Sequence, residues 1–402
     1  LGAWFPSRRP TVRRRSPHRI EGAAAVMVNS CGEDPAAAGV GVDGGGSGCP
    51  GSSATAVSTA AAQQLAAQED LLELPPGSLR TPRGAPVEFA RLKDLREKGA
   101  GEFCKVCEGS LDVDGTGLRR VAVKMLKPKY EASVVPLGDL RREISLLSQM
   151  SHPHIVGFVA HGCAADRGVP FGCFDLFAHP LSFLLPTKSD TGKALPWKTS
   201  KAAREWPVSR GVAVGLQLAR ALRYCHDEFM PGYRLLHRDI KPDNIGCFAD
   251  GRIVLADFGL CKLWKVDSAA SDDERRKLTG LTGSLRYMAP EVALQEPYNH
   301  KAEVFSFTSL LYHFLSHQKP FSWMTPDTFL ADACRNGKRP LLSGKWPGDV
   351  QALMAAGWSS DSRARPEFAK VVVALEEAIG RPQSLAEVLE RSKAPSSRSS
   401  AQ

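Results

Sequence analysis

The stretch LLHRDIKPDNIGCFADGRIVLADFGL, residues 235–260, constrains this chain more than any other part of its sequence. It places Asp239, Lys241 and Asn244 on one short loop and Asp257 on a second, linked loop. A carboxylate can accept a proton from a hydroxyl, carboxylate and amide oxygens suit a hard divalent cation, and an ammonium group offsets phosphate charge. Together these groups are what an enzyme needs to transfer a phosphoryl group.

The order and spacing of these residues resemble the H-R-D…N and D-F-G motifs of the protein kinases. Either triplet alone is ordinary polar turn chemistry beside a strand, but the two at this spacing are far more specific. The resemblance implies an α+β, bilobal kinase fold, with a small β-rich N-lobe that carries one regulatory helix and a larger, mainly helical C-lobe. It also implies that Asp239 deprotonates the acceptor hydroxyl, Lys241 balances the γ-phosphate, and Asn244 and Asp257 hold Mg²⁺.

Upstream, the run LKDLREKGAGEFCKVCEGSL predicts two strands joined by a glycine turn. Two glycines in a turn usually indicate only a hairpin. In the kinases, however, the backbone amides of such a loop approach the nucleotide phosphates where side chains are absent. Cys104 stands where the third glycine of that loop would be, which leaves a thiol near the nucleotide. The residues expected to cover ATP are Gly99, Ala100, Gly101, Phe103 and Val106.

The run VAVK at residues 121–124 predicts an apolar strand, and DLRREISLLSQM after it has the period of an amphipathic helix. A lone lysine in a strand is normally a solvated edge residue. Here Glu143 on the predicted helix stands where the kinase lysine–glutamate ion pair requires a carboxylate. The resemblance therefore implies that Lys124 binds the inner phosphates of ATP, that Glu143 holds it, and that Ala122 contacts the nucleotide.

The segment PFGCFDLFAHPLSFLL resembles the edge strand and the hinge between the lobes. If Asp175 is the hinge acid, Phe174 is the gatekeeper, and residues from Asp175 to Phe177 offer backbone groups to adenine. Two positions beyond Asn244, Gly246 stands where kinases commonly place a bulky apolar residue under the adenine ring. Losing that contact costs about 1–3 kcal/mol of ring packing unless a neighbour fills the gap. We therefore predict a roomier adenine pocket, in which Gly246→Leu keeps or tightens ATP binding.

The chain between Asp257 and Glu291 has the length and the A-P-E ending of an activation segment. Arg238 belongs to the arginines that clamp a phosphate on this segment in a subset of the kinases, because a phosphate carries nearly two negative charges. We predict regulation through Arg238 and through phosphorylation of Thr279 and Thr282, with Ser268 and Ser271 as lesser alternatives.

The run KAEVFSFTSLLYHFLSHQKPF resembles the buried helix that supports the large lobe. Glu303 stands there in place of the usual Asp that bonds the backbone of the catalytic loop, and a longer acid can still reach that loop. The ending GWSSDSRARPEF is similar to the tyrosine-kinase-like group of serine/threonine kinases. Arg365 in this ending is expected to form a structural ion pair with Glu291, and a last helix closes the domain near Ile379.

The flanking sequence predicts tails. An arginine-rich run, which carries most of the formal charge of +9, precedes a segment rich in Ala, Gly and Ser that cannot offset the entropy of ordering. Residues 1–26 precede Met27, which is a candidate for the first residue of the native protein. The predicted limits are a disordered tail over 1–88, a kinase domain over 89–379 (N-lobe 89–174, hinge 175–178, C-lobe 179–379) and a second tail over 380–402.

Composition indicates where in the cell the protein is expected and which kinds of partner it is not expected to bind. The 10 cysteines are scattered, as is typical of reduced intracellular proteins, and the close pair Cys104 and Cys107 lacks the second pair that a zinc site needs. We read both as strand residues. No run of 18 or more apolar residues predicts a membrane span. We expect a cytoplasmic protein, with nuclear or organellar targeting by the arginine-rich tail left open. Nucleic-acid binding is not predicted, because that tail lacks interleaved aromatic residues.

The predicted function is a serine/threonine protein kinase that uses ATP and Mg²⁺, acts on protein substrates, and is switched on by an upstream kinase or by itself. The loop sequence H-R-D-I-K-P-D-N is typical of the serine/threonine kinases rather than the tyrosine kinases. The alternative is a pseudokinase that keeps the fold as a scaffold. It is disfavoured because Lys124, Asp239, Asn244 and Asp257 are all present, and it is left open by three departures from the family: Cys104, Gly246 and Glu303.

Overall fold

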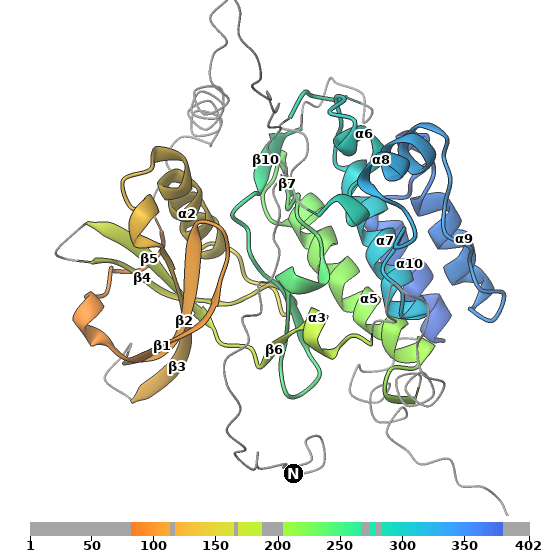
Figure 1. Ribbon diagram of the computed structural model, residues 1–402. Coiled ribbons are helices and arrows are strands. Elements are labelled where there is room, and N and C mark those ends of the chain that lie inside the picture. The colour runs from red at the N-terminus through yellow and green to blue at the C-terminus, as the bar shows by residue number, and fades with distance from the viewer. Residues whose placement is uncertain are drawn as a thin grey trace, which may run out of the picture. The chain divides into compact units, whose positions relative to one another are not determined.

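The computed structural model describes residues 82–112, 117–164, 168–186, 204–266, 274–278 and 284–380. Within them lie a β-rich N-lobe and a mainly helical C-lobe (Figure 1), as predicted. Several predictions fall outside the described residues: the tails before 82 and after 380, and the four candidate phosphorylation sites Ser268, Ser271, Thr279 and Thr282.

The N-lobe is built on a five-stranded sheet with the order β1-β2-β3-β5-β4, in which all neighbouring strands are antiparallel. The apolar face of this sheet buries side chains from its central strands, among them Leu111, Val121 and Phe171. Cys104 and Cys107 both lie on β2, as predicted, and neither forms a disulfide. The strands are β1 (Leu92–Ala100), β2 (Cys104–Asp112), β3 (Leu118–Leu126), β4 (Phe158–Ala164) and β5 (Val169–Asp175).

One helix, α2 (Val134–Leu147), packs on the sheet and confirms the predicted amphipathic segment. Its apolar side is buried through Leu140, Ile144 and Leu147. The helix begins before the predicted run, because Pro136 falls in its first turn, where no backbone amide needs an intrahelical partner. Glu143 therefore sits on a helix whose position is set by burial against β3 and β5.

Residues 82–88, which we call the strap, contact the N-lobe before β1 begins. The Val87 amide donates to the His161 carbonyl of β4 (2.7 Å), and the Arg83 amide donates to Ser148 Oγ just after α2 (3.0 Å). Gly162 makes this approach possible, because a Cβ there would lie 2.1 Å from the Val87 carbonyl oxygen. The strap thus ties the edge of the sheet to the end of α2, ahead of Phe89, where we expected the domain to start.

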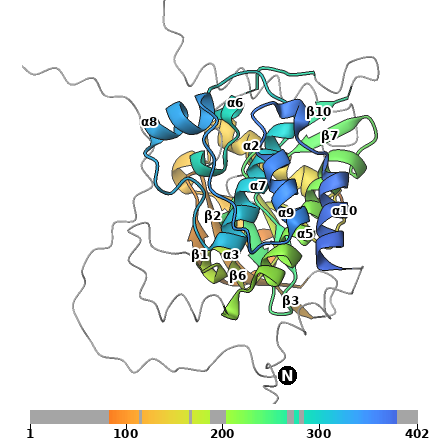
Figure 2. The ribbon, with the colours of Figure 1, turned by 90° about the vertical axis from the view of Figure 1, so that its right-hand side faces the viewer.

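The C-lobe is a group of helices around α7 (Figure 2). The residues of α7 from Lys301 to Leu315 are buried, with the exception of Ser306. α5 packs on α7 and α10, and α9 packs on the same two helices. The longer helices are α5 (Val208–Arg223), α7 (Lys301–Ser316), α9 (Gly348–Gly357) and α10 (Phe368–Ile379), which is the predicted last helix. The short ones are α3 (Leu181–Leu184), α6 (Pro290–Ala293) and α8 (Pro326–Thr328), and π-helical turns cover Tyr224–Glu228 and Phe329–Arg335.

Two small sheets in the C-lobe hold the loops that carry the predicted chemistry. One pairs β7 (Tyr233–Leu236) with β10 (Lys262–Lys265), and the other has the order β6-β8-β9. The loop with Asp239 leaves β7 and enters β8, while Asp257 lies between β9 and β10. The strands of the second sheet are β6 (His179–Pro180), β8 (Ile245–Cys247) and β9 (Ile253–Leu255).

Backbone hydrogen bonds join the two lobes at β9. The Leu255 amide donates to the His154 carbonyl, and the Val156 amide donates to the Leu255 carbonyl, both at 2.9 Å. The segment after α2 is therefore paired with the strand that leads to Asp257. No helix within the described residues is long and apolar enough to cross a membrane.

Candidate active site

The loop after β7 brings Asp239, Lys241 and Asn244 together. Asp239 is buried, and its Oδ2 accepts hydrogen bonds from Lys241 Nζ (2.6 Å) and Asn244 Nδ2 (2.8 Å). Its other oxygen, Oδ1, is buried too and accepts no hydrogen bond from the described part of the chain. A buried carboxylate oxygen without a donor is costly unless a ligand supplies one. One oxygen is thus fixed by the protein, and the other is left to receive a proton.

Glu303 holds this loop from below, as predicted. From the first turn of α7, its Oε1 accepts the Arg238 amide (2.6 Å), and its Oε2 lies 2.6 Å from His226 Nε2. Burial alone would raise the pKa of Glu303, but the hydrogen bond and charge of His226 and the Arg238 amide lower it overall. The longer side chain of Glu303 therefore reaches the loop and contacts the Arg238 amide and His226 at the same time. The sequence analysis missed His226, which no motif marks.

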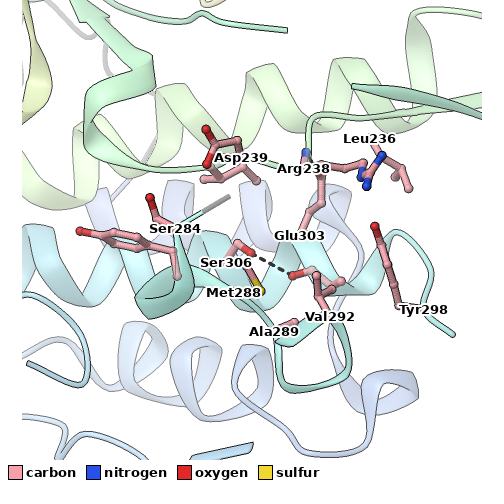
Figure 3. A pocket seen from close by; sticks show the side chains of 13 residues that line it. Leu236, Arg238, Asp239, Ser284, Met288, Ala289, Val292, Tyr298, Glu303 and Ser306 are labelled. Carbon is pink, nitrogen blue, oxygen red and sulfur yellow. Dashed lines mark hydrogen bonds between the residues drawn. The ribbon is translucent and has the colours of Figure 1, made fainter. Parts of the chain in front are cut away.

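The backbone at Arg238 is left-handed, with φ at +69°. This region is unfavourable for residues other than glycine and persists where surrounding contacts fix it. The bond from Glu303 is such a contact. Figure 3 views the neighbouring pocket, whose lining includes Arg238, Asp239, Ser284 and Glu303. The loop that carries Asp239 and the segment that ends in A-P-E therefore line the same pocket.

Lys124 joins the lobes. Its Nζ lies 2.6 Å from Glu143 Oε2 on α2 and 2.7 Å from Asp257 Oδ1 in the C-lobe. Burial alone would lower the pKa of Lys124, but the charges of Glu143 and Asp257 outweigh burial and raise it overall, so the side chain is cationic. The predicted ion pair with Glu143 is confirmed. Glu143 also accepts the Phe258 amide (3.1 Å), so α2 contacts the D-F-G turn directly.

Asp257 is positioned to bind a cation with Asn244. Its backbone φ is +63°, and its side chain is 52% exposed, so the carboxylate is open to a ligand. Burial of part of the group would raise its pKa, but Lys124 outweighs this effect and lowers the pKa overall. The neighbouring Ala256 amide donates to the Asn244 carbonyl (2.9 Å), which links the two candidate ligands.

The donor set fits a magnesium ion that is only partly held by the protein. The described residues contain no group of three or more His, Cys, Asp or Glu side chains arranged to hold a metal. Mg²⁺ commonly takes one or two carboxylates and completes its shell with phosphate and water oxygens. Asn244 and Asp257 supply oxygen ligands of that kind, so they fit a cation that arrives with a nucleotide.

The turn between β1 and β2 is open on its outer side. A Cβ at Gly99, near the end of β1, would meet nothing within 4 Å, and one at Gly101 in the turn would meet only the Cys104 carbonyl oxygen, at 3.8 Å. Phe103 packs on Tyr130 with ring centroids 5.1 Å apart, which anchors the turn at one side. Burial raises the pKa of the Cys104 thiol to about 11, so this thiol is neutral at physiological pH. The remaining predicted residues of the loop are Ala100, Gly101 and Val106, and Val106 is directly opposite Lys124 in the strand pair.

The hinge is pinned at both ends by backbone hydrogen bonds. The Asp175 amide donates to the Gly157 carbonyl (2.8 Å), and the Ala178 amide donates to the Cys247 carbonyl (2.9 Å). The Asp175 carboxylate is bound by Arg119 (2.6 Å). Phe174 is buried and paired with Ala122 across β3 and β5. The Asp175 amide is therefore already used within the protein and is not available to a ligand.

The predicted roomier pocket at Gly246 is wrong. A Cβ on Gly246 would lie 2.3 Å from Cδ1 and 2.5 Å from Cγ of Phe177, so the phenylalanine ring of the hinge fills this space. A leucine at position 246 would collide with that ring. The prediction failed because it judged position 246 without its neighbour from the hinge, which lies far away in the sequence.

A second arginine accompanies Arg238. Burial raises the pKa of Cys261, just after D-F-G, to about 12, and both Arg142 of α2 and Arg238 are close enough to act on it through their charges. Both arginines are therefore within electrostatic range of Cys261, and Arg142 forms an ion pair with Asp139 on its own helix.

The predicted ion pair between Glu291 and Arg365 is confirmed. Arg365 Nη1 and Nη2 lie 2.5 Å and 3.0 Å from the two carboxylate oxygens of Glu291, and Arg365 is fully buried. This bidentate pair fixes the end of the activation segment to the segment before α10. It lies away from Asp239 and has a structural role.

Comparison with known proteins agrees with this geometry. Residues 92–375 match the model of a family described as protein tyrosine and serine/threonine kinase. The chain is 29% identical to the human serine/threonine-protein kinase TNNI3K over 282 residues, 70% of this chain and 30% of the relative. It is 34% identical to the Arabidopsis thaliana serine/threonine-protein kinase VIK over 260 residues, 64% of this chain and 54% of the relative. A third relative, the dual specificity protein kinase shkB of Dictyostelium discoideum, is 28% identical over 68% of this chain and 38% of its own length.

Proposed function

Because the chain belongs to the protein tyrosine and serine/threonine kinase family, we propose that it transfers the γ-phosphate of ATP to serine and threonine hydroxyls of proteins. The match spans only part of the length of the relatives, so the activity and substrates of the whole protein rest on this proposal. The observation that carries it is the carboxylate of Asp239, with Oδ2 fixed by Lys241 and Asn244 and Oδ1 buried without a donor from the described residues.

The nucleotide is proposed to bind between the lobes. Lys124, fixed as a cation by Glu143, contacts its inner phosphates, and the residues from Asp175 to Phe177 face its base. The turn between β1 and β2 covers the phosphates, because Gly99 and Gly101 carry no side chain and leave their backbone accessible there. The contacts proposed for ATP are Gly99, Ala100, Gly101, Phe103, Val106, Ala122, Lys124, Glu143, Asp175 and Phe177.

The chemistry requires position and charge rather than a covalent intermediate. Asn244 and Asp257 would hold Mg²⁺, which would offset the charge on the phosphate oxygens of ATP. Asp239 Oδ1 accepts the proton of the acceptor hydroxyl as its oxygen attacks the γ-phosphorus, the bond from that phosphorus to the bridging oxygen of the β-phosphate breaks, and ADP leaves. Lys241, which is hydrogen-bonded to Asp239, lies on the same loop and offsets charge on the phosphoryl group.

Serine and threonine are the proposed acceptors, because the loop carries Lys241 two residues after Asp239. A relative named as dual specificity makes tyrosine the outcome to test against. Phosphoamino-acid analysis of labelled peptide mixtures decides between them. Serine or threonine label supports the proposal, and label on tyrosine alone would refute it.

Regulation is proposed through the activation segment. A phosphate on Thr279 or Thr282, added by an upstream kinase or by the protein itself, would be bound by Arg238. We also propose residues 89–379 as the kinase domain, with the hinge at 175–178 and tails on both sides. An intracellular, cytoplasmic location is part of the same proposal.

The test is an assay with ATP and Mg²⁺ that compares the wild type with Asp257→Ala. We expect turnover to fall at least about a hundredfold, because the variant loses a proposed cation ligand and one of the two partners of Lys124. Asp327→Ala, at an exposed acid of α8, is the matched control and should keep wild-type turnover. Equal turnover in Asp257→Ala and the wild type, with both proteins folded by circular dichroism, would refute the assigned site.

A further inference from the structure

Phe177 of the hinge and Gly246 of β8 are in direct contact. An added Cβ on Gly246 would lie 2.3, 2.5 and 2.7 Å from three consecutive ring carbons of Phe177, namely Cδ1, Cγ and Cε1. Real Cβ atoms do not approach another carbon this closely. One side of the phenylalanine ring therefore rests against the Gly246 backbone, in the space that any larger residue would occupy.

The backbone fixes both members of this contact. Gly246 is buried in the small sheet, paired with Pro180 on one side and with Val254 on the other. The hinge is bound to the same strand, because the Ala178 amide donates to the Cys247 carbonyl (2.9 Å). Phe177 precedes Ala178, so its Cα has little freedom to move away from Gly246. The contact thus follows from strand pairing rather than from a chance rotamer.

The Phe177 ring is only partly buried. It packs against the main core on one side, and part of it remains open. Its place is the linker between β5 and β6, where the two lobes meet. An aromatic ring offers a flat apolar surface that binds another planar ring by stacking, and such surfaces commonly line nucleotide pockets.

We infer that Phe177 and Gly246 act as one unit: the hinge ring forms the apolar floor under the nucleotide base, and the glycine is the residue that makes room for it. This inference rests on the proposed function and specifies how its site holds a purine base. The floor is supplied by the hinge, and β8 contributes only backbone. Phe177 is accordingly a binding residue that sets affinity for the base.

The inference requires that substitutions at the two positions compensate each other. Gly246→Leu alone forces the ring out, and we expect ADP affinity to fall about tenfold or more. Phe177→Ala alone removes the stacking surface and should weaken ADP binding roughly five- to tenfold. In Phe177→Ala/Gly246→Leu the leucine side chain enters the space left by the ring. Affinity should then return to within about threefold of the wild type.

The experiment is calorimetric titration of ADP into the full chain for the wild type, both single variants and the double variant. Phe183→Ala removes a phenylalanine of α3 that is 72% exposed, and this matched control should bind ADP like the wild type. Recovery of affinity in the double variant supports the inference. Wild-type affinity in Gly246→Leu, or a double variant that binds no better than the weaker single variant, overturns it.

Thermal unfolding without nucleotide is a second, independent test of the contact between Phe177 and Gly246. Gly246→Leu should lower the unfolding temperature, and adding Phe177→Ala should raise it again, because the collision is removed. A lower temperature in the double variant than in Gly246→Leu would contradict the contact. These measurements test the inference separately from the proposed function. A wild type that binds ADP but does not phosphorylate proteins would refute the function alone. An active enzyme in which the effects of the two substitutions on ADP affinity simply add would refute the inference alone.

Discussion

At the scale of single residues, the site is defined by how each charge is held. Lys124 has the partner that the sequence motifs predicted, Glu143, at 2.6 Å. Asp239 is bound by Lys241 and Asn244 of its own loop, which the motifs did not predict as its partners. Glu303 was predicted to reach the loop, and it does so with a second partner, His226, that no motif marks. Gly246 was misjudged because its environment depends on Phe177. Motifs thus predict which residues do chemistry better than they predict what fills the space around them.

The geometry of Glu303 gives a prediction at this scale. Glu303→Asp shortens the side chain, so it can no longer contact both the Arg238 amide and His226. Losing one hydrogen bond to a buried carboxylate should cost about 1.5–3 kcal/mol of unfolding free energy and lower kcat more than KM. Urea unfolding and steady-state kinetics measure the two effects. Wild-type stability in Glu303→Asp would show that only one of the contacts matters.

At the scale of elements, α2 is the part whose position matters most to the site. It carries Glu143, and Ser148 just after its end accepts a hydrogen bond from the strap. The segment that follows α2 in the chain pairs with β9. Its existence and its apolar side were predictable from periodicity, because a helix has a strong local signal. The strap was not predictable, because its contacts with β4 follow from Gly162 and a distant sheet edge rather than from any local pattern.

The strap is tested by the smallest side chain that displaces it. Gly162→Ala puts a Cβ 2.1 Å from the Val87 carbonyl oxygen and 2.5 Å from Cζ of the buried Phe171, so residues 82–88 should detach and the Phe171 ring must shift. We expect a loss of about 1–3 kcal/mol in unfolding free energy and faster proteolysis within the strap. Gly138→Ala, in α2, where a Cβ meets nothing within 4 Å, is the control and should be neutral or stabilising. If the two variants had the same unfolding free energy and the same rate of proteolysis in residues 82–88, the strap would not contribute to stability as we propose.

The activation segment gives a second prediction for an element. Replacing both Thr279 and Thr282 by Ala should lower turnover about tenfold or more, because Arg238 would lose the phosphate proposed to order the segment. Mass spectrometry of the active wild type should find phosphate on one of these residues. Unchanged turnover of the double variant would end this hypothesis.

At the scale of the whole molecule, several buried histidines make stability depend on pH. Burial is the main cause that lowers the pKa of His154 and of His300 to about 4, and of His313 to about 3. The unfolded chain, with histidine pKa near 6.5, binds more protons than the fold between about pH 6.5 and 4. Stability therefore falls as the pH falls through this range, by about 2 kcal/mol for each such histidine at pH 5.

Equilibrium urea unfolding at pH 7.5, 6.0 and 5.0 measures this dependence, and the lowered carboxyl pKa of Glu303 adds a further loss only below about pH 4.5. His154→Gln should flatten the curve, because it removes one of the groups that must stay neutral. A free energy of unfolding that is constant from pH 7.5 to 5.0 would contradict the burial of these histidines.

The central claim is that Asp239 accepts the proton of a serine or threonine hydroxyl while ATP donates its γ-phosphate. The most direct measurement compares transfer of labelled γ-phosphate to a protein mixture by the wild type and by Asp239→Asn, with ADP affinity measured for both. We predict label on serine or threonine with the wild type, a loss of roughly 10²–10⁴ in kcat for Asp239→Asn, and ADP affinity unchanged within about twofold. No transfer by the wild type, or equal transfer by both proteins, would contradict the account.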